Sequence, residues 1–124
     1  MQERGARTAA LRGLLAQHDP SAQTLTGGLR VCYLPGQGRG VVSGGLVLLD
    51  SSESDAELAV QLAHLCTHVE DGLGDGCARG IEAARASEER ARGREDRLRQ
   101  RLALPLRVGP AAADEDYARR CPAR

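Results

Sequence analysis

The sequence predicts a small α+β domain with an N-terminal helix, a short and mostly antiparallel β-sheet, a motif helix and a second long C-terminal helix. Three observations predict this class: apolar residues recur at helical spacing over residues 3–17, alternate with polar residues around residue 30, and return to helical spacing after residue 55. A chain of 124 residues is expected to form one domain. We assign residues 1–107 to that domain and residues 108–124, which lack clear periodicity, to an irregular C-terminal tail.

The composition excludes several classes of protein. The chain has 17 basic and 17 acidic residues, so its net charge gives no general attraction to nucleic acid or to a membrane surface. No apolar run approaches the roughly 20 residues of a membrane span, and no signal-peptide pattern follows Met1. We therefore expect a soluble, cytoplasmic protein. Its four cysteines form no Cys-x-x-Cys pair, which excludes a zinc ribbon or a thioredoxin-type motif.

The first half of the chain is predicted to form a helix followed by two strands. The helix over residues 3–17 ends before Pro20. Apolar residues alternate over residues 29–33, which predicts a short strand. A second strand is predicted over residues 41–49, where the continuous apolar run indicates burial on both faces. The glycine-rich turn between them, residues 36–40, lacks the Lys-Ser/Thr of a phosphate-binding loop.

The second half is predicted to hold two long helices. Ser52 or Ser54 can cap the first, which runs from about residue 55 to residue 71. The second helix begins near residue 77, reaches about residue 102 and is closed by Pro105.

Charge is shared unevenly between these helices. Residues 50–75 contain seven acidic residues and no arginine, whereas residues 79–107 contain nine arginines and five acidic residues. We expect the two helices to attract each other across the fold. In an alternative hypothesis, the arginine-rich segment binds an unknown protein or peptide partner and the chain is a metal-free interaction or regulatory module. Nucleic acid is not an expected partner, because the patch is mixed in sign and lacks aromatic residues for stacking.

His64 and His68 are two of only three histidines, and they lie four residues apart in the first of these helices. Side chains at i and i+4 share one face of a helix, so both imidazoles can reach the same metal ion. On a helical wheel this face also holds Glu57, Gln61 and Asp71, so we expect the histidines to border a cleft or solvent. A polar stripe that is simply solvated is the alternative interpretation.

The segment GGLVLLDSSESDAELAVQLAHLCTHVEDG, residues 44–72, resembles the strand, capped loop and active-site helix of zincin metallopeptidases. It is most similar to the small single-domain kind, in which an apolar edge strand and a short Ser/Asp-rich loop precede a Leu-Ala-His-Glu-x-x-His helix. Leu62-Ala63-His64 and His68 match that pattern. A leading helix and short strands before the motif are also similar. The resemblance implies a small zincin-like domain, with zinc as its cofactor.

The resemblance further implies a third metal ligand from a later helix. Zincins of the glutamate class often place this ligand in a Glu-x-x-Ala sequence, which Glu88-Glu89-Arg90-Ala91 matches. The candidate metal ligands are therefore His64, His68 and Glu88.

The pattern of the second helix supports Glu88 independently. Glu88 and Glu95 lie in line with its apolar residues, and a carboxylate that faces a core is unfavourable unless it is paired or binds a metal. Asp71 and Asp75 are alternative third ligands. An exposed Glu88, or one that pairs with Arg92, is the alternative without metal.

Leu65 departs from the zincin pattern. A working zincin has a glutamate directly after its first histidine, and this carboxylate takes a proton from the zinc-bound water and passes it to the leaving amine. Leucine can do neither, so we expect no catalytic residue and interpret the chain as a degenerate, inactive pseudoenzyme that either retains metal binding or has lost the metal as well. A metal-dependent hydrolase with an unrecognised base, such as Glu88 or Glu89, is the other alternative.

Overall fold

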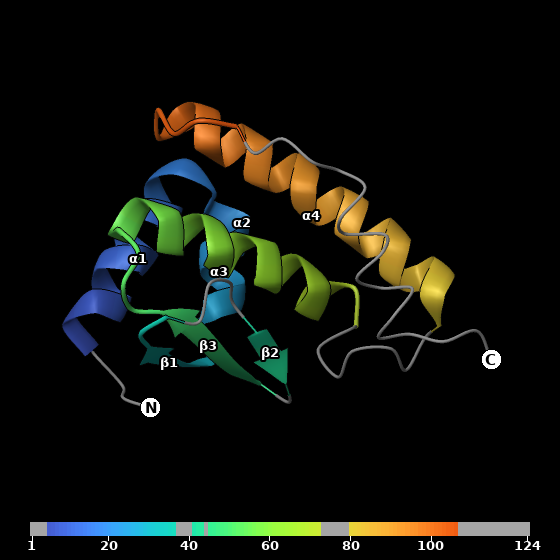
Figure 1. Cartoon of the computed structure of the whole chain (residues 1–124), viewed down its shortest axis with the longest axis horizontal. Helices are drawn as coiled ribbons and strands as arrows, with labels where there is room; N and C mark the ends of the chain where they lie inside the picture. Colours follow the sequence, from blue (N-terminus) through green and yellow to red (C-terminus); the bar gives the residue numbers. More distant parts are fainter. Residues whose placement is uncertain (1–4, 37–40, 44, 73–79, 107–124) are drawn as a thin grey trace.

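The computed structural model describes residues 5–36, 41–43, 45–72 and 80–106, and it confirms the α+β class. The predicted tail, residues 108–124, lies outside the described residues. In chain order the elements are α1 (Gly5–His18), α2 (Pro20–Thr26), β1 (Arg30–Leu34), β2 (Val41–Ser43), β3 (Leu46–Asp50), α3 (Asp55–Glu70) and α4 (Ile81–Arg101) (Figure 1).

The described strands form one sheet in the order β1-β3-β2. β1 and β3 are parallel and pair from Arg30↔Leu46 to Leu34↔Asp50. β2 is antiparallel to β3 but contributes only three residues. The prediction of a mostly antiparallel sheet is therefore wrong, because the longer pairing is parallel.

The segment predicted as one strand over residues 41–49 forms two strands. Gly45 lies in the turn between β2 and β3 with φ +81°, a conformation that glycine adopts without steric cost. β3 folds back against β2 and takes the central position, where Val47 and Leu49 are fully buried and where it runs alongside β1. The strand that precedes the Ser/Asp-rich loop is consequently the central strand, not the edge strand of the zincin pattern.

The short helix α2 is absent from the prediction. Asp19 separates it from α1, and Oδ1 of Asp19 accepts a hydrogen bond from the backbone N–H of Ala22 at 3.4 Å. Pro20 occupies the first turn, where a missing N–H removes no helical hydrogen bond. The Asp-Pro pair that ends α1 thus also starts α2, and Ala22 and Thr26 are fully buried.

α3 is the central helix of the fold. Figure 1 shows it between the sheet and α4, and α1 and α2 also pack against it. The Ser54 hydroxyl caps its first turn by accepting a hydrogen bond from the backbone N–H of Glu57 at 3.2 Å, which confirms one of the two predicted caps. Buried residues of the hydrophobic core are Leu11, Leu15, Ala22, Leu29, Val31, Tyr33, Val47, Leu49, Leu58, Ala59, Val60, Leu62, Ala63, Leu65, Cys66 and Leu98.

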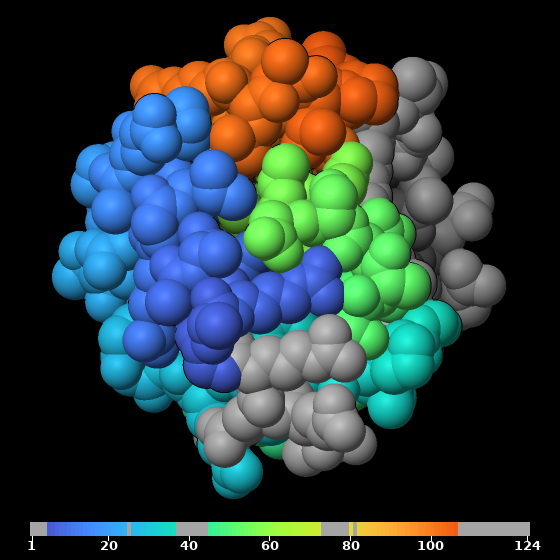
Figure 2. All heavy atoms as spheres, turned by 90° about the vertical axis from the view of Figure 1, so that its left-hand side faces the viewer, coloured from blue at the N-terminus to red at the C-terminus, as the bar shows by residue number. Residues whose placement is uncertain are grey.

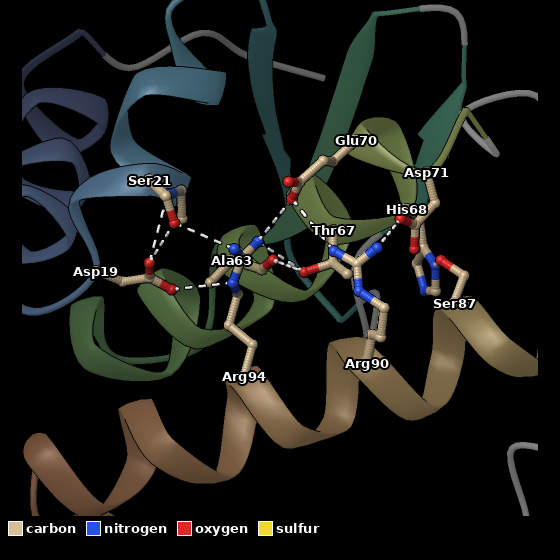
Figure 3. Close-up of polar contacts among 11 residues, drawn as sticks. Asp19, Ser21, Ala63, Thr67, His68, Glu70, Asp71, Ser87, Arg90 and Arg94 are labelled. Carbon is tan, nitrogen blue, oxygen red and sulfur yellow. Dashed lines mark hydrogen bonds and ion pairs between the residues drawn. The ribbon is translucent and has the colours of Figure 1, made fainter.

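α4 packs on α3 largely through polar contacts, because its buried apolar side chains are only Ala84, Ala91 and Leu98 among those described. Figure 2 shows the C-terminal part of α4 in orange, next to α3 in green and the α1–α2 segment in blue. The predicted attraction between acidic and arginine-rich helices is confirmed, and Figure 3 shows part of it. Ion pairs across the α3–α4 interface are Arg90 with Asp71, Arg94 with Glu70 at 3.4 Å, and Arg99 with Glu57 at 2.7 Å.

Candidate metal centre

His64, His68 and Glu88 come together between α3 and α4. Nε2 of His64 lies 3.0 Å from Oε2 of Glu88, and Nε2 of His68 lies 2.9 Å from the same oxygen. One potential ligand atom from each residue lies within 4.8 Å of the others. The structure therefore brings together all three residues that the sequence predicts as metal ligands.

Helix geometry explains this convergence. The two imidazoles lie one turn apart on α3, with ring centroids separated by 4.9 Å and ring planes inclined by 69°. On α4, the fully buried Ala84 and Ala91 flank Glu88 at one turn on either side. Their small side chains let the two helix backbones approach closely, so the glutamate side chain reaches both rings.

Each histidine is also held from its other nitrogen. Nδ1 of His68 lies 2.8 Å from Oγ of Ser87, and Nδ1 of His64 lies 3.3 Å from Oε1 of Glu95. Both Nδ1 atoms thus have a side-chain partner, and both Nε2 atoms are directed toward Glu88. Ser87, which Figure 3 shows beside His68, is not among the site residues predicted from the sequence. Its position three residues after Ala84 places it on the buried face of α4, which is the signal that could have identified it.

The centre lies mostly beneath α4 and not at a solvated face. The side chains of His64, His68 and Glu88 are 20%, 8% and 14% exposed. The expectation that the histidines border a cleft or solvent is therefore wrong for His68, which is buried. α4 covers this face because its own polar side chains complement the polar stripe of α3.

The acidic neighbours control the protonation of the centre. Burial alone lowers the pKa of His64, but hydrogen bonds and charge from Glu88 and Glu95 outweigh this effect and raise the pKa to about 9. Burial alone raises the pKa of Glu88, but hydrogen bonds and charge from the two histidines outweigh this effect and lower the pKa to well below the usual range of a carboxyl. In the absence of a metal ion, an ionised Glu88 therefore accepts hydrogen bonds from both Nε2–H groups.

Of the two alternative third ligands, Asp71 lies among the described residues. Asp71 pairs with Arg90 and does not belong to the group of converging ligand atoms. Asp75 lies outside the described residues. Glu88 is the acidic residue that meets both histidines.

Among the described residues, Leu65, Cys66, Glu70 and Glu89 do not belong to the group of converging ligand atoms. Leu65 is buried in the hydrophobic core, and Glu89 is exposed. Glu70 contacts Arg94 and Arg90. Burial raises the pKa of the Cys66 thiol to about 12, so this cysteine is not a ready nucleophile.

Comparison with models of protein families, with curated proteins and with solved structures gives no match for this chain. Its functional assignment therefore depends on its own residues. Among the described helices, none is both long and apolar enough to cross a membrane.

Proposed function

We propose that this chain is a zincin-like, metallopeptidase-related domain that binds a divalent metal ion, zinc, through His64, His68 and Glu88 and has no ordinary peptidase activity. One observation carries the metal site: both Nε2 atoms meet one carboxylate oxygen while both Nδ1 atoms are held by other side chains. Metal-binding histidines characteristically use one ring nitrogen for the ion and donate a hydrogen bond from the other.

The donor set and its spacing suit zinc. Two imidazole nitrogens and one carboxylate oxygen are a common protein ligand set for zinc, with a fourth position left for water. Bonds of about 2.0–2.1 Å place tetrahedral ligand atoms about 3.3 Å apart. The observed nitrogen-to-oxygen distances of 3.0 Å and 2.9 Å are therefore within a few tenths of an ångström of the required spacing. The ligand atoms as a group lie within 4.8 Å of one another, so the two imidazoles would also have to move closer together to bind one ion.

The local charge also favours a divalent cation. Glu88 and Glu95 face His64 from two sides. The other nearby carboxylate, Glu57, is balanced by the guanidinium of Arg99. With neutral histidines, the carboxylates of Glu88 and Glu95 place negative charge on both sides of His64, and this charge favours a divalent cation.

The order of elements supports a relation to zincins. An apolar strand, β3, leads into a Ser/Asp-rich loop, and Ser54 of that loop caps the helix that carries both histidines. A later helix, α4, supplies the glutamate. This is the order that the resemblance of residues 44–72 implies.

Zinc analysis tests the proposal. Protein purified without a metal-affinity tag is dialysed against chelator and then titrated with zinc in competition with a chromogenic chelator. We expect one zinc ion per chain in the wild-type protein and in Glu89→Gln, since Glu89 is the exposed neighbour of Glu88 on α4. His68→Ala and Glu88→Gln should lose this binding while their circular dichroism shows a folded domain. Absence of zinc binding in the wild-type protein would favour the metal-free interaction module.

A further inference from the structure

A chain of charged side chains extends from His64 along the α3–α4 interface. Oε1 of Glu95 lies 3.3 Å from Nδ1 of His64, and Oε2 of Glu95 lies 3.5 Å from Nε of Arg99. Arg99 also binds Glu57 through two hydrogen bonds, of 3.0 Å and 2.7 Å, to its two carboxylate oxygens. The four residues alternate in sign when His64 is protonated, and they join the start of α3 to its metal-binding turn.

Arg99 is fixed more firmly than an ordinary surface arginine. It is 1% exposed, and its Nη1 also donates a hydrogen bond to the backbone carbonyl of Pro105 at 3.2 Å. A paired guanidinium with this many contacts has a defined orientation, because its planar fork matches the two oxygens of Glu57. The pKa of Arg99 is raised because the hydrogen bonds and charges of Glu57 and Glu95 outweigh the lowering effect of burial.

Glu95 needs such a neighbour. It is 8% exposed, and a buried carboxylate is unfavourable unless other groups balance its charge. Its first oxygen faces His64 and its second faces Arg99, so the position of Arg99 determines how the carboxylate is turned. Glu57, in turn, sets the position of Arg99.

We propose that Glu57 and Arg99 are positioning residues of the metal centre, which hold Glu95 where it accepts the Nδ1–H hydrogen bond of His64 and thereby leave Nε2 of His64 for the ion. This inference rests on the proposed function, since it explains how one of the three ligands is oriented. It adds two residues that act on the metal centre through Glu95 and not as ligands of the ion.

The two histidines differ in the kind of group that faces Nδ1. Ser87 faces Nδ1 of His68 with a hydroxyl, which can donate or accept a hydrogen bond and so does not select one tautomer. An ionised Glu95 can only accept, so it requires a proton on Nδ1 of His64. The row of charged residues from Glu57 through Arg99 to Glu95 therefore keeps a proton on Nδ1 of His64. The Ser87 hydroxyl, in contrast, can adapt to either tautomer of His68.

The test compares Glu57→Gln and Arg99→Lys with a matched control, Arg94→Lys. Arg94 joins the same two helices through Thr67, at 2.9 Å, and Glu70, but it contacts neither Glu95 nor the metal-binding histidines among its described partners (Figure 3). We expect zinc affinity to fall about tenfold in Glu57→Gln and in Arg99→Lys, the lower end of the effect of outer-shell changes. Arg94→Lys should keep the wild-type zinc affinity, even if its melting temperature falls as much as that of Glu57→Gln or Arg99→Lys.

Nitrogen-15 NMR of the imidazole rings distinguishes a positioning role from a purely structural one, because weaker helix packing alone would not change the His64 signals. In the wild-type and Arg94→Lys proteins with zinc bound at Nε2, the Nδ1–H group of His64 should be held by Glu95, and in Glu57→Gln the signals of Nδ1 and its proton should broaden or shift because this acceptor is no longer fixed. Unchanged zinc affinity and unchanged His64 signals in Glu57→Gln would overturn the inference. An equal loss of affinity in Arg94→Lys would also overturn it, because general weakening of helix packing would then explain both.

Failure of the proposed function gives a different result. If the wild-type protein binds no zinc, His64 carries a proton on both ring nitrogens at neutral pH, and the chemical shifts of Nδ1 and its proton then report whether Glu57 and Arg99 hold Glu95 against Nδ1. A His64 signal that is the same in wild type and Glu57→Gln overturns the positioning role in that case as well.

Discussion

His64 and Glu88 are 24 residues apart in the chain, and Nε2 of His64 lies 3.0 Å from Oε2 of Glu88. Because His68 meets the same oxygen at 2.9 Å, one carboxylate joins two turns of α3 to α4. Without a metal ion the three residues form a hydrogen-bonded cluster. In the metal centre that we propose, the same three residues would hold the ion.

The first prediction concerns the stability of the ion-free protein. Glu88→Ala leaves two Nε2–H groups of a mostly buried cluster without their acceptor, which should lower the free energy of unfolding by about 1–3 kcal/mol. Urea unfolding in the presence of chelator measures this change. Glu89→Ala, at the exposed neighbouring position, should change the free energy by less than about 0.5 kcal/mol. Equal losses in the two variants would contradict the structural role of Glu88.

The second prediction concerns pH. The pKa of His64 is about 9 in the folded protein, above the ordinary value of 6.5, so the folded state binds this proton more tightly than the unfolded state. The stabilising contribution of His64 is therefore complete below pH 6.5 and is lost as the pH rises from 6.5 through 9. Urea unfolding of the ion-free protein across this range should show stability falling with pH. The His64→Gln variant should lack that part of the slope, and an identical slope in both proteins would contradict the prediction.

The sequence is most informative where a single helix face determines the outcome. The spacing of His64 and His68, and the alignment of Glu88 with apolar residues, are local properties of two helices, so all three candidate ligands could be predicted. Ser87 and Glu95 lie on the same face of α4, but which imidazole nitrogen each of them meets depends on how α4 is aligned along α3, and helical periodicity does not determine that alignment.

Strand pairing could not be predicted for the same reason, because it depends on contacts between distant segments of the chain. Apolar runs predict strands, but the pairing of β1 with β3 depends on where β3 returns after the turn at Gly45. The contact between Glu57 and Arg99 spans 42 residues of the chain, and several arginines of α4 could have faced that carboxylate. α2 was missed for a different reason, because Pro20 is compatible both with the end of one helix and with the first turn of the next.

The third prediction concerns Cys66. Burial raises the pKa of its thiol to about 12 and leaves the side chain without solvent access, so the reactive thiolate is scarce at neutral pH. Iodoacetamide at pH 8 should label Cys66 in urea but not in the folded protein, as measured by mass spectrometry of proteolytic fragments. Rapid native labelling would show that α3 opens to solvent and would restore a thiol mechanism as a candidate.

The fourth prediction concerns catalysis. The wild-type protein with zinc should hydrolyse no peptide from a mixed peptide library, because the position after His64, where zincins carry the base, holds a leucine that is buried in the hydrophobic core. Turnover that disappears in His64→Ala would contradict this.

Leu65→Glu tests whether the missing base alone accounts for inactivity. Leu65 is only 7% exposed and packs in the hydrophobic core, so an ionised glutamate there is unfavourable unless it turns toward the metal centre. We expect Leu65→Glu to lower the free energy of unfolding by about 2 kcal/mol or more without creating peptidase activity. Chemical unfolding and the same peptide assay measure both effects. If Leu65→Glu cleaves peptides at wild-type stability, the substrate cleft is intact and only the base has been lost; the expected result instead means that the core has closed over the position where the base would act.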